Sequence, residues 1–224
     1  MKFAHPEISG VFEINKPYVN TLVIENQQLF SELLCDIYMG TRGLDSKSVL
    51  SVHDTPVPIE KYAEMISSFV DLNINRKPLL NKIIARMEQI SVDAEHYLRT
   101  ASLLAELESV VEEWAFDIPC DIIASKVHVS AILKAIGIEL RDHYNGSSVL
   151  GEKLLDYMEL VREFDQDKLF ILVGLRSYID DTTTAQFLQT ALLHEYRILL
   201  IDSREHLRLP MEKRLTVDVD LCEF

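Results

Sequence analysis

The chain has 224 residues, of which 48% are hydrophobic, with only 7 glycines and 7 prolines. This composition is typical of a globular protein with a buried core and excludes a disordered or low-complexity chain. Its 22 basic and 36 acidic residues give a net charge of −14, which repels polyanions at long range. A nucleic-acid-binding function would therefore need segregated charge or bound cations.

The sequence carries no sign of export or of a membrane span. The N-terminal residues MKFAHPEISG lack a cationic start followed by an apolar run, and the densest apolar stretches are about as long as a strand. The three cysteines, Cys35, Cys120 and Cys222, are far apart and form no C-x-x-C pair. We therefore expect a cytoplasmic protein with no membrane partner and no disulfide framework.

The first part of the chain predicts strands over residues 11–14 and 21–25, followed by a helix. Asn26 can cap this helix, and Gly40 is expected to close it. Its apolar positions fall on one face, at Leu29, Leu33 and Ile37. Two prolines near residue 57 then punctuate the chain, and we place a domain boundary near residue 59.

Beyond this boundary the hydrophobic period becomes helical. A helix is expected over residues 60–72, and from Pro78 apolar residues recur every three or four positions as far as Trp114. Because glycine and proline are absent until Pro119, this run predicts one helix of about 35 to 40 residues, about 55 Å long, that projects as an arm. A return helix is expected within residues 126–140.

The last part of the chain predicts a return to α/β structure. In chain order we expect a helix over 147–164 capped by Ser147 or Ser148, a strand over 169–173, a helix over 183–193, a strand over 197–202 and an edge strand over 214–221. Continuous apolar runs separated by helices predict a mostly parallel sheet covered on both faces. The fold class is therefore α/β, with a discontinuous head domain (residues 1–59 and 147–224) and an inserted long-helical leg domain (residues 60–146).

A strand and helix in this order raise the possibility of nucleotide hydrolysis. That activity calls for G-x-x-x-x-G-K-[ST] between the first strand and its helix, because glycine lets backbone N–H groups surround phosphates and lysine neutralises them. The junction here reads TLVIENQQLF, with Glu25 in the turn. We therefore predict that no nucleotide binds there. Asp180 and Asp181, in the stretch GLRSYIDD, are interpreted as cap residues of the following helix, with metal binding as the alternative.

Other catalytic patterns are absent from the sequence. None of the seven histidines lies in H-E-x-x-H, and no G-x-S-x-G occurs. A nuclease dependent on a divalent metal could still assemble carboxylates from strand ends, such as Asp202 and Asp180. This possibility stays open, although no specific spacing supports it, and we predict that the protein is not an enzyme.

Charge is segregated along the predicted helical domain. Residues 73–87 contain four basic residues and no acidic one. Lys82 and Arg86, four positions apart on one helical face, are placed to touch phosphates, although a solvated helix with chance clustering is the alternative interpretation. The candidate DNA-binding residues are Arg76, Lys77, Lys82, Arg86, Lys126, Lys134 and Arg141.

Residues 88–121, in contrast, contain nine acidic residues, with Arg99 as the one basic residue. Gathered carboxylates repel one another unless cations join them, and hard oxygen ligands from flexible turns favour Ca²⁺ over a transition metal. No EF-hand loop is present, so an exposed acidic face is the alternative. The candidate calcium ligands are Glu112, Glu113, Asp117, Asp121, Glu139 and Asp142.

Four segments together resemble a known family along essentially the whole chain. They read NTLVIENQQLFSELL, ILKAIGIEL, GEKLLDYMELVREFDQDKLFILVGLRSYIDD and YRILLIDSREHLRL. In this order and spacing they resemble the ring-forming adaptation protein of type II-A CRISPR systems, an accessory subunit of spacer acquisition. None of the four is a catalytic signature.

The resemblance implies an α/β head similar to a P-loop nucleotide hydrolase core that has lost its phosphate loop, with a helical leg. It further implies a homotetrameric ring supported by Ca²⁺ that takes double-stranded DNA ends through a lysine-lined hole, without known catalysis. The implied partners are the CRISPR integrase complex and the interference nuclease. Lys134 is the basic residue carried over by position, whereas directly after Asp121 the chain reads IIASK in place of the acidic residues of relatives. A protein-only scaffold of the adaptation complex is the remaining alternative.

Overall fold

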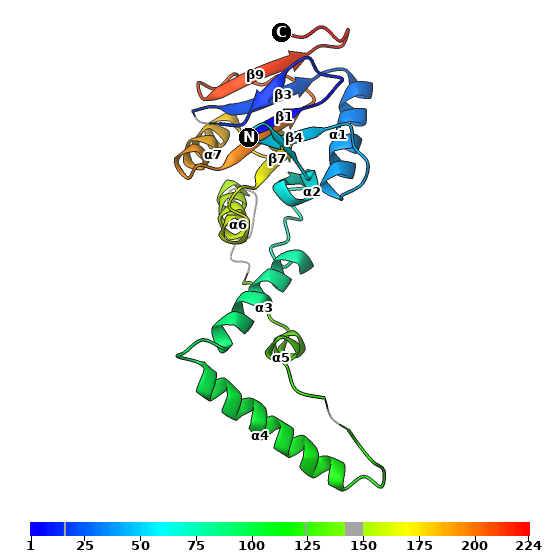
Figure 1. The fold of residues 1–224 in the computed structure, drawn as a ribbon. Helices are drawn as coiled ribbons and strands as arrows, with labels where there is room; N and C mark the ends of the chain where they lie inside the picture. Colours follow the sequence, from blue (N-terminus) through cyan, green and yellow to red (C-terminus); the bar gives the residue numbers. More distant parts are fainter. Residues whose placement is uncertain (16, 124, 142–149) are drawn as a thin grey trace. The chain divides into compact units, whose positions relative to one another are not determined.

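A computed structural model of the chain describes residues 1–15, 17–123, 125–141 and 150–224 (Figure 1). Contacts divide the chain into two compact units. The first comprises Met1–Leu72 and His143–Phe224, and the second comprises Asn73–Asp142. The first unit is thus built from two separate parts of the chain, and its first part ends later than residue 59, where the sequence suggested a boundary.

A five-stranded sheet forms the centre of the first unit. Its order is β6 (Ala63–Ile66), β7 (Leu169–Val173), β8 (Arg197–Asp202), β3 (Val19–Ile24) and β9 (Glu212–Val217). Each neighbouring pair is parallel. Every residue of β3 and β7 is buried, as expected for strands covered on both faces. The predicted parallel sheet and the edge position of the last strand are confirmed.

Helices cover the two faces of this sheet. Helix α1 (Gln27–Thr41) packs its buried stripe of Leu29, Leu33 and Ile37 into the core formed with β3, β7 and β8. Figure 1 shows α1 on one side of the sheet and α6 (Leu150–Phe164) with α7 (Asp181–Leu193) on the other. A short 3₁₀ turn, η2 (Leu175–Ser177), joins β7 to α7. Among the residues that the structure describes, no helix is long and apolar enough to cross a membrane.

A small antiparallel sheet completes the core beside α1. Its order is β2 (Val11–Glu13), β1 (Lys2–Ala4), β4 (Val49–Val52) and β5 (Thr55–Val57). Phe3 and Leu50 from this sheet are buried in the same core as α1. The β4–β5 turn places His53 and Asp54 at φ 49° and 60°, which matches the positive-φ pair of a type I′ hairpin.

Two predictions about the first unit were wrong in detail. Residues 60–72 do not form one helix: α2 (Ile59–Tyr62) is a single turn, and the chain then enters β6 beside β7. Gly40 does not close α1 but lies within it, where an added Cβ would come within 3.0 Å of Ile59 and Ser46 side-chain atoms. A larger residue at this position would therefore require the Ile59 or Ser46 side chain to shift by a few tenths of an ångström.

The second unit contains α3 (Lys77–Ser91), α4 (Tyr97–Phe116) and α5 (Val129–Ile136), and α3 packs against α5. The predicted continuous helix from residue 78 onward is wrong, because the chain breaks between α3 and α4. The Asp93 carboxylate accepts hydrogen bonds from the backbone N–H groups of Glu95 and His96, at 3.0 and 2.9 Å. An aspartate that binds nearby backbone donors favours a turn over helix continuation.

Candidate nucleic-acid interface

The first group of candidate cations lies on and before α3. Arg76 is the N-cap residue of this helix, Lys77 is its first residue, and Pro78 follows. Lys82 and Arg86 lie one turn apart further along it, and all four cations are exposed. The buried contacts of α3 are made by Leu79 and Ile84, so the charged groups stay in solvent.

A reciprocal hydrogen-bond pair joins the start of α3 to the segment that follows α5. The Asn75 amide donates to the Leu140 carbonyl at 2.9 Å, and the Leu140 N–H donates to Asn75 Oδ1 at 2.6 Å. Arg76 and Arg141 each lie one residue from this clamp, and both are exposed. The structure thus brings together cations that are far apart in the sequence.

The remaining two basic candidates lie on α5 and just before it. Lys134 lies in the last turn of α5, where Gly137 (φ 74°) ends the helix and its N–H donates to the Lys134 carbonyl. A cation at this end also interacts favourably with the helix dipole. Lys126 lies before α5, next to Val127, whose N–H donates to Glu108 Oε1 at 3.2 Å. Both ammonium-bearing side chains are exposed.

The acidic candidates are spread along and beyond α4. Glu112 and Glu113 lie on this helix, Asp117 is its C-cap residue, Asp121 follows, and Glu139 precedes the clamp residue Leu140. All five are exposed, whereas Asp142 lies outside the described residues. Within the described part of one chain, no three His, Cys, Asp or Glu side chains gather closely enough to hold a metal ion. Their oxygens suit Ca²⁺ chemically, but a single chain's described residues do not assemble a site.

The junction between β3 and α1 carries a side-chain cap. Asn26 Oδ1 accepts from the Leu29 N–H at 3.0 Å, and its amide donates to the Val219 carbonyl at 2.9 Å. The cap therefore occupies a backbone donor of the kind that surrounds phosphate in a P-loop. The predicted Asn26 cap is confirmed.

The strand-end carboxylates considered for a nuclease have structural contacts. Asp180 caps α7 by accepting from the Thr183 N–H at 2.8 Å, and this bond holds the pKa of Asp180 below its usual range. Asp181 pairs with Arg176. Asp202 is 3% exposed, and burial raises the pKa of Asp202 to about 6 against the opposing effect of Arg176. The predicted cap role holds for Asp180, whereas Asp181 forms an ion pair.

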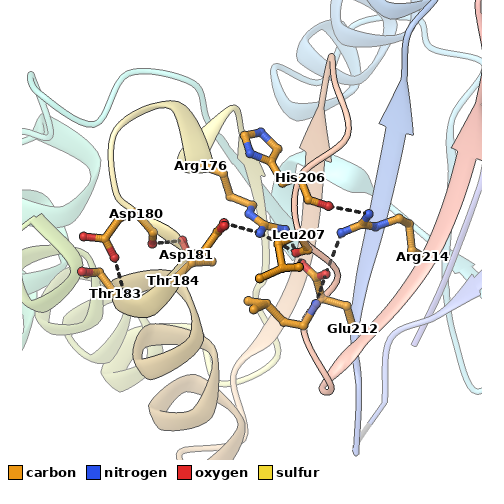
Figure 2. Close-up of polar contacts among 10 residues, drawn as sticks. Arg176, Asp180, Asp181, Thr183, Thr184, His206, Leu207, Glu212 and Arg214 are labelled. Atoms are coloured by element: carbon orange, nitrogen blue, oxygen red, sulfur yellow. Dashed lines mark hydrogen bonds and ion pairs between the residues drawn. The ribbon is translucent and has the colours of Figure 1, made fainter.

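Sequence reasoning missed a buried ion-pair cluster around Arg176, shown in Figure 2. The Arg176 guanidinium binds Glu212 Oε1 at 3.1 Å and the Leu207 carbonyl at 2.6 Å. Arg214 binds the other Glu212 oxygen at 2.9 Å. The cluster ties η2, the start of α7 and the β8–β9 connection together. Its one sequence signal is an arginine three residues after the end of a buried strand, which does not reveal its partner.

Comparison with models of known protein families shows to which family the chain belongs. A family model described as "CRISPR-associated protein (Cas_Csn2)" matches residues 43–221. The chain belongs to this family. Membership confirms the resemblance drawn from the sequence and implies a role related to CRISPR adaptation. The matched range includes all the candidate basic and acidic residues.

A solved structure shows the same fold. The crystal structure of Stu0660 of Streptococcus thermophilus is similar with a TM-score of 0.60 and 14% sequence identity, over 97% of this chain and 75% of that chain. At this identity the similarity concerns the fold alone. No curated protein matches the chain.

Proposed function

We propose that the protein is a non-enzymatic accessory factor of CRISPR spacer acquisition that binds double-stranded DNA ends without sequence preference. In this proposal it acts as a homotetrameric ring supported by calcium. The observation that carries the proposal is the group of exposed cations on α3 and around the Asn75–Leu140 clamp, in a chain of net charge −14. Family membership supports the biological setting.

Affinity in this proposal comes from phosphate neutralisation. Lysine and arginine side chains that touch phosphates release condensed counterions, which gives binding that is independent of sequence and weakened by salt. One anionic chain opposes a duplex at long range. Several copies that direct Lys134, Arg86 and their neighbours toward one axis would concentrate positive charge there, and this is why the proposal requires assembly.

The surface of α4 supports self-association. This helix has no buried residue, and it exposes Leu98 by 79%, Trp114 by 65% and Phe116 by 91%. A helix that leaves large apolar side chains exposed along its length has apolar area available for contact with another chain. We assign this surface to contacts between copies of the helical unit, which the proposal treats as a leg.

Calcium is part of the proposal through the acidic candidates. Because the described residues of one chain gather no metal-binding group, the ligands must come from more than one copy or include residues that the structure does not describe. Glu112, Glu113 and Asp117 would supply hard oxygen donors, and a bound cation would reduce repulsion between the acidic surfaces.

We also propose that the first unit descends from a nucleotide hydrolase core whose phosphate loop was lost. Its parallel sheet with helices on both faces and its β3–α1 junction, with Glu25 and Asn26 in place of a glycine-rich loop, support this idea. The proposed partners are the integrase complex and the interference nuclease of the same system.

A band-shift assay tests the function. Linear and closed circular duplexes of one sequence are compared with and without Ca²⁺, and linear DNA is expected to bind more tightly, with the difference requiring calcium. Lys134→Glu should weaken binding and lower the salt slope by about one, whereas Lys47→Glu, in the first unit, should not. Equal binding of both topologies would remove the end-binding claim.

A cleavage assay on the same DNA and a spacer-acquisition assay separate the two alternatives. A nuclease would cleave the linear duplex with Mg²⁺ or Mn²⁺ and lose activity in Asp202→Ala. A protein-only scaffold would support spacer acquisition even after charge reversal at Lys82, Arg86 and Lys134. Intact DNA together with loss of acquisition in the charge-reversal variant would support the proposal over both.

A further inference from the structure

A pocket of about 500 Å³ opens at the amino-terminal edge of the parallel sheet, beside the first residues of β3 and β9. It is lined by Tyr18, Arg208, Leu209, Pro210, Glu212 and Lys213. Its size is within the range of small-molecule sites. The edge is the opposite one from the β3–α1 junction, where a P-loop protein would hold its nucleotide.

Hydrogen bonds to the backbone anchor several residues of the pocket lining. The Leu209 N–H donates to Glu212 Oε2 at 3.0 Å, and the Glu212 N–H donates to the Leu209 carbonyl at 3.0 Å. The Val19 N–H donates to the Met211 carbonyl at 2.9 Å, which fixes the position next to Tyr18. Three backbone-anchored contacts thus hold the lining before any ligand arrives.

The pocket is locally cationic in an acidic protein. Its one acidic lining residue, Glu212, is paired with the buried guanidinium groups of Arg176 and Arg214, as Figure 2 shows. Arg208 and Lys213 are exposed, and the side chain of neither has a hydrogen-bond or ion-pair partner among the described residues. Two cations at the rim therefore remain available to an anion.

Tyr18 adds a flat apolar surface to this rim. Its side chain is 51% exposed, and Leu209 and Pro210 lie in the same lining. An aromatic face beside two cations suits a ligand that carries both a ring and a phosphate, because the ring stacks while a guanidinium binds phosphate oxygens in pairs. A phosphate monoester carries about 1.5 to 2 negative charges, so two cations attract it more strongly than they attract a carboxylate with one charge.

We propose that this pocket binds a nucleoside monophosphate unit, either free or at the end of a DNA strand. The free-nucleotide form is independent of the proposed duplex binding by the second unit, whereas the strand-end form would add a contact to it. In both forms Arg208 and Lys213 hold the phosphate and Tyr18 stacks on the base.

Calorimetric titration tests the recognition chemistry. Deoxyadenosine monophosphate should bind at least about ten-fold more tightly than either inorganic phosphate or deoxyadenosine, because it engages both halves of the pocket. Arg208→Gln and Tyr18→Leu should each weaken it about ten-fold. The matched controls are Arg42→Gln and Tyr38→Leu. They change the same residue types away from the pocket: Tyr38 is 49% exposed, and the Arg42 guanidinium lies over its ring. Neither control should change the affinity.

Further titrations identify the source of the ligand. A single-stranded oligonucleotide with a terminal phosphate that binds more tightly than the mononucleotide assigns the site to strand ends, and the reverse order assigns it to free nucleotides. Lys134→Glu, which tests the duplex interface, should leave mononucleotide binding unchanged, so the two proposals fail separately.

Three results would overturn the inference. One is the absence of saturable mononucleotide binding. Another is inorganic phosphate binding as tightly as the mononucleotide with no effect of Tyr18→Leu, which would indicate an anion site without base recognition. The third is tight binding of an acidic aromatic peptide that the mononucleotide does not displace, which would make the pocket a peptide site.

Discussion

The substitution Glu212→Gln removes the negative charge at the centre of the buried cluster. The Glu212 side chain is 0% exposed and accepts from Arg176 at 3.1 Å, from Arg214 at 2.9 Å and from the Leu209 N–H at 3.0 Å. Glutamine retains the size and one oxygen acceptor but leaves two buried guanidinium groups without their shared anion. Removing one partner of a buried ion pair costs about 3–5 kcal/mol.

The expected cost lies near the lower limit, about 3 kcal/mol, because Arg176 keeps Asp181 and the Leu207 carbonyl as partners. For a protein of this size that corresponds to a fall in Tm of about 6–12 °C. Urea unfolding followed by circular dichroism measures the change, with Glu205→Gln on the same connection as the control, expected within about 0.5 kcal/mol of the unsubstituted protein. A loss below about 1 kcal/mol for Glu212→Gln would refute the reasoning.

Three further changes test other contacts. The folded-state pKa of Asp202 is raised to about 6, above an unfolded value of about 3.9, so its burial costs stability above about pH 6 and not below about pH 4. Asp202→Asn should therefore raise the unfolding free energy by about 2–3 kcal/mol near pH 8 in urea titrations, and a gain that persists at pH 4 would contradict this. Asn75→Leu removes both bonds to Leu140 and should lower amide-exchange protection over residues 129–141 by about ten-fold, while α7 keeps its protection. Asp180→Ala should lower Tm by about 2–4 °C, and Asp180→Ser should recover most of the loss if the cap is the cause.

The parts of the fold that were predictable depend on local signals. The apolar runs of β3, β7 and β8 predict buried parallel strands. A strand covered on both faces needs apolar residues at successive positions, and this pattern is visible in the sequence. Asn26 and Asp180 are predictable as caps for a similar reason, since a cap needs only a short polar side chain within three residues of its donor.

The errors arise where tertiary contacts override local pattern. The apolar residues of Ala63–Ile66 have a spacing that is compatible with a helix. The segment instead forms a strand, because it pairs with the edge of β7. The break at Asp93 is the opposite case, in which one side chain captures two backbone donors and outweighs a long helical period. Hydrophobic periodicity reveals neither the pairing of β6 with β7 nor the hydrogen bonds that the Asp93 side chain accepts.

The candidate sites were less predictable than the fold. The separation of basic and acidic residues is readable from the sequence, but the Asn75–Leu140 clamp joins positions whose relation depends on the fold. Arg176 and Glu212 were missed because charged residues are normally assigned to the surface, and a buried pair is recognisable only when both partners are located. The pocket beside Tyr18 depends on the same cluster for its floor.

Under the proposed function, the net charge would affect assembly and DNA binding in opposite ways. Copies of a chain with charge −14 repel one another, so salt that screens this repulsion should favour assembly, even though it weakens phosphate contacts through counterion release. Calcium would act differently from sodium chloride, because a few ions bound directly by carboxylates lower the repulsion locally at concentrations too low to screen the whole surface. Raising sodium chloride should therefore increase the assembled fraction while reducing DNA affinity, whereas low calcium should increase both. Parallel loss of assembly and DNA binding as sodium chloride rises would mean that ionic contacts, and not the exposed apolar residues of α4, hold the copies together.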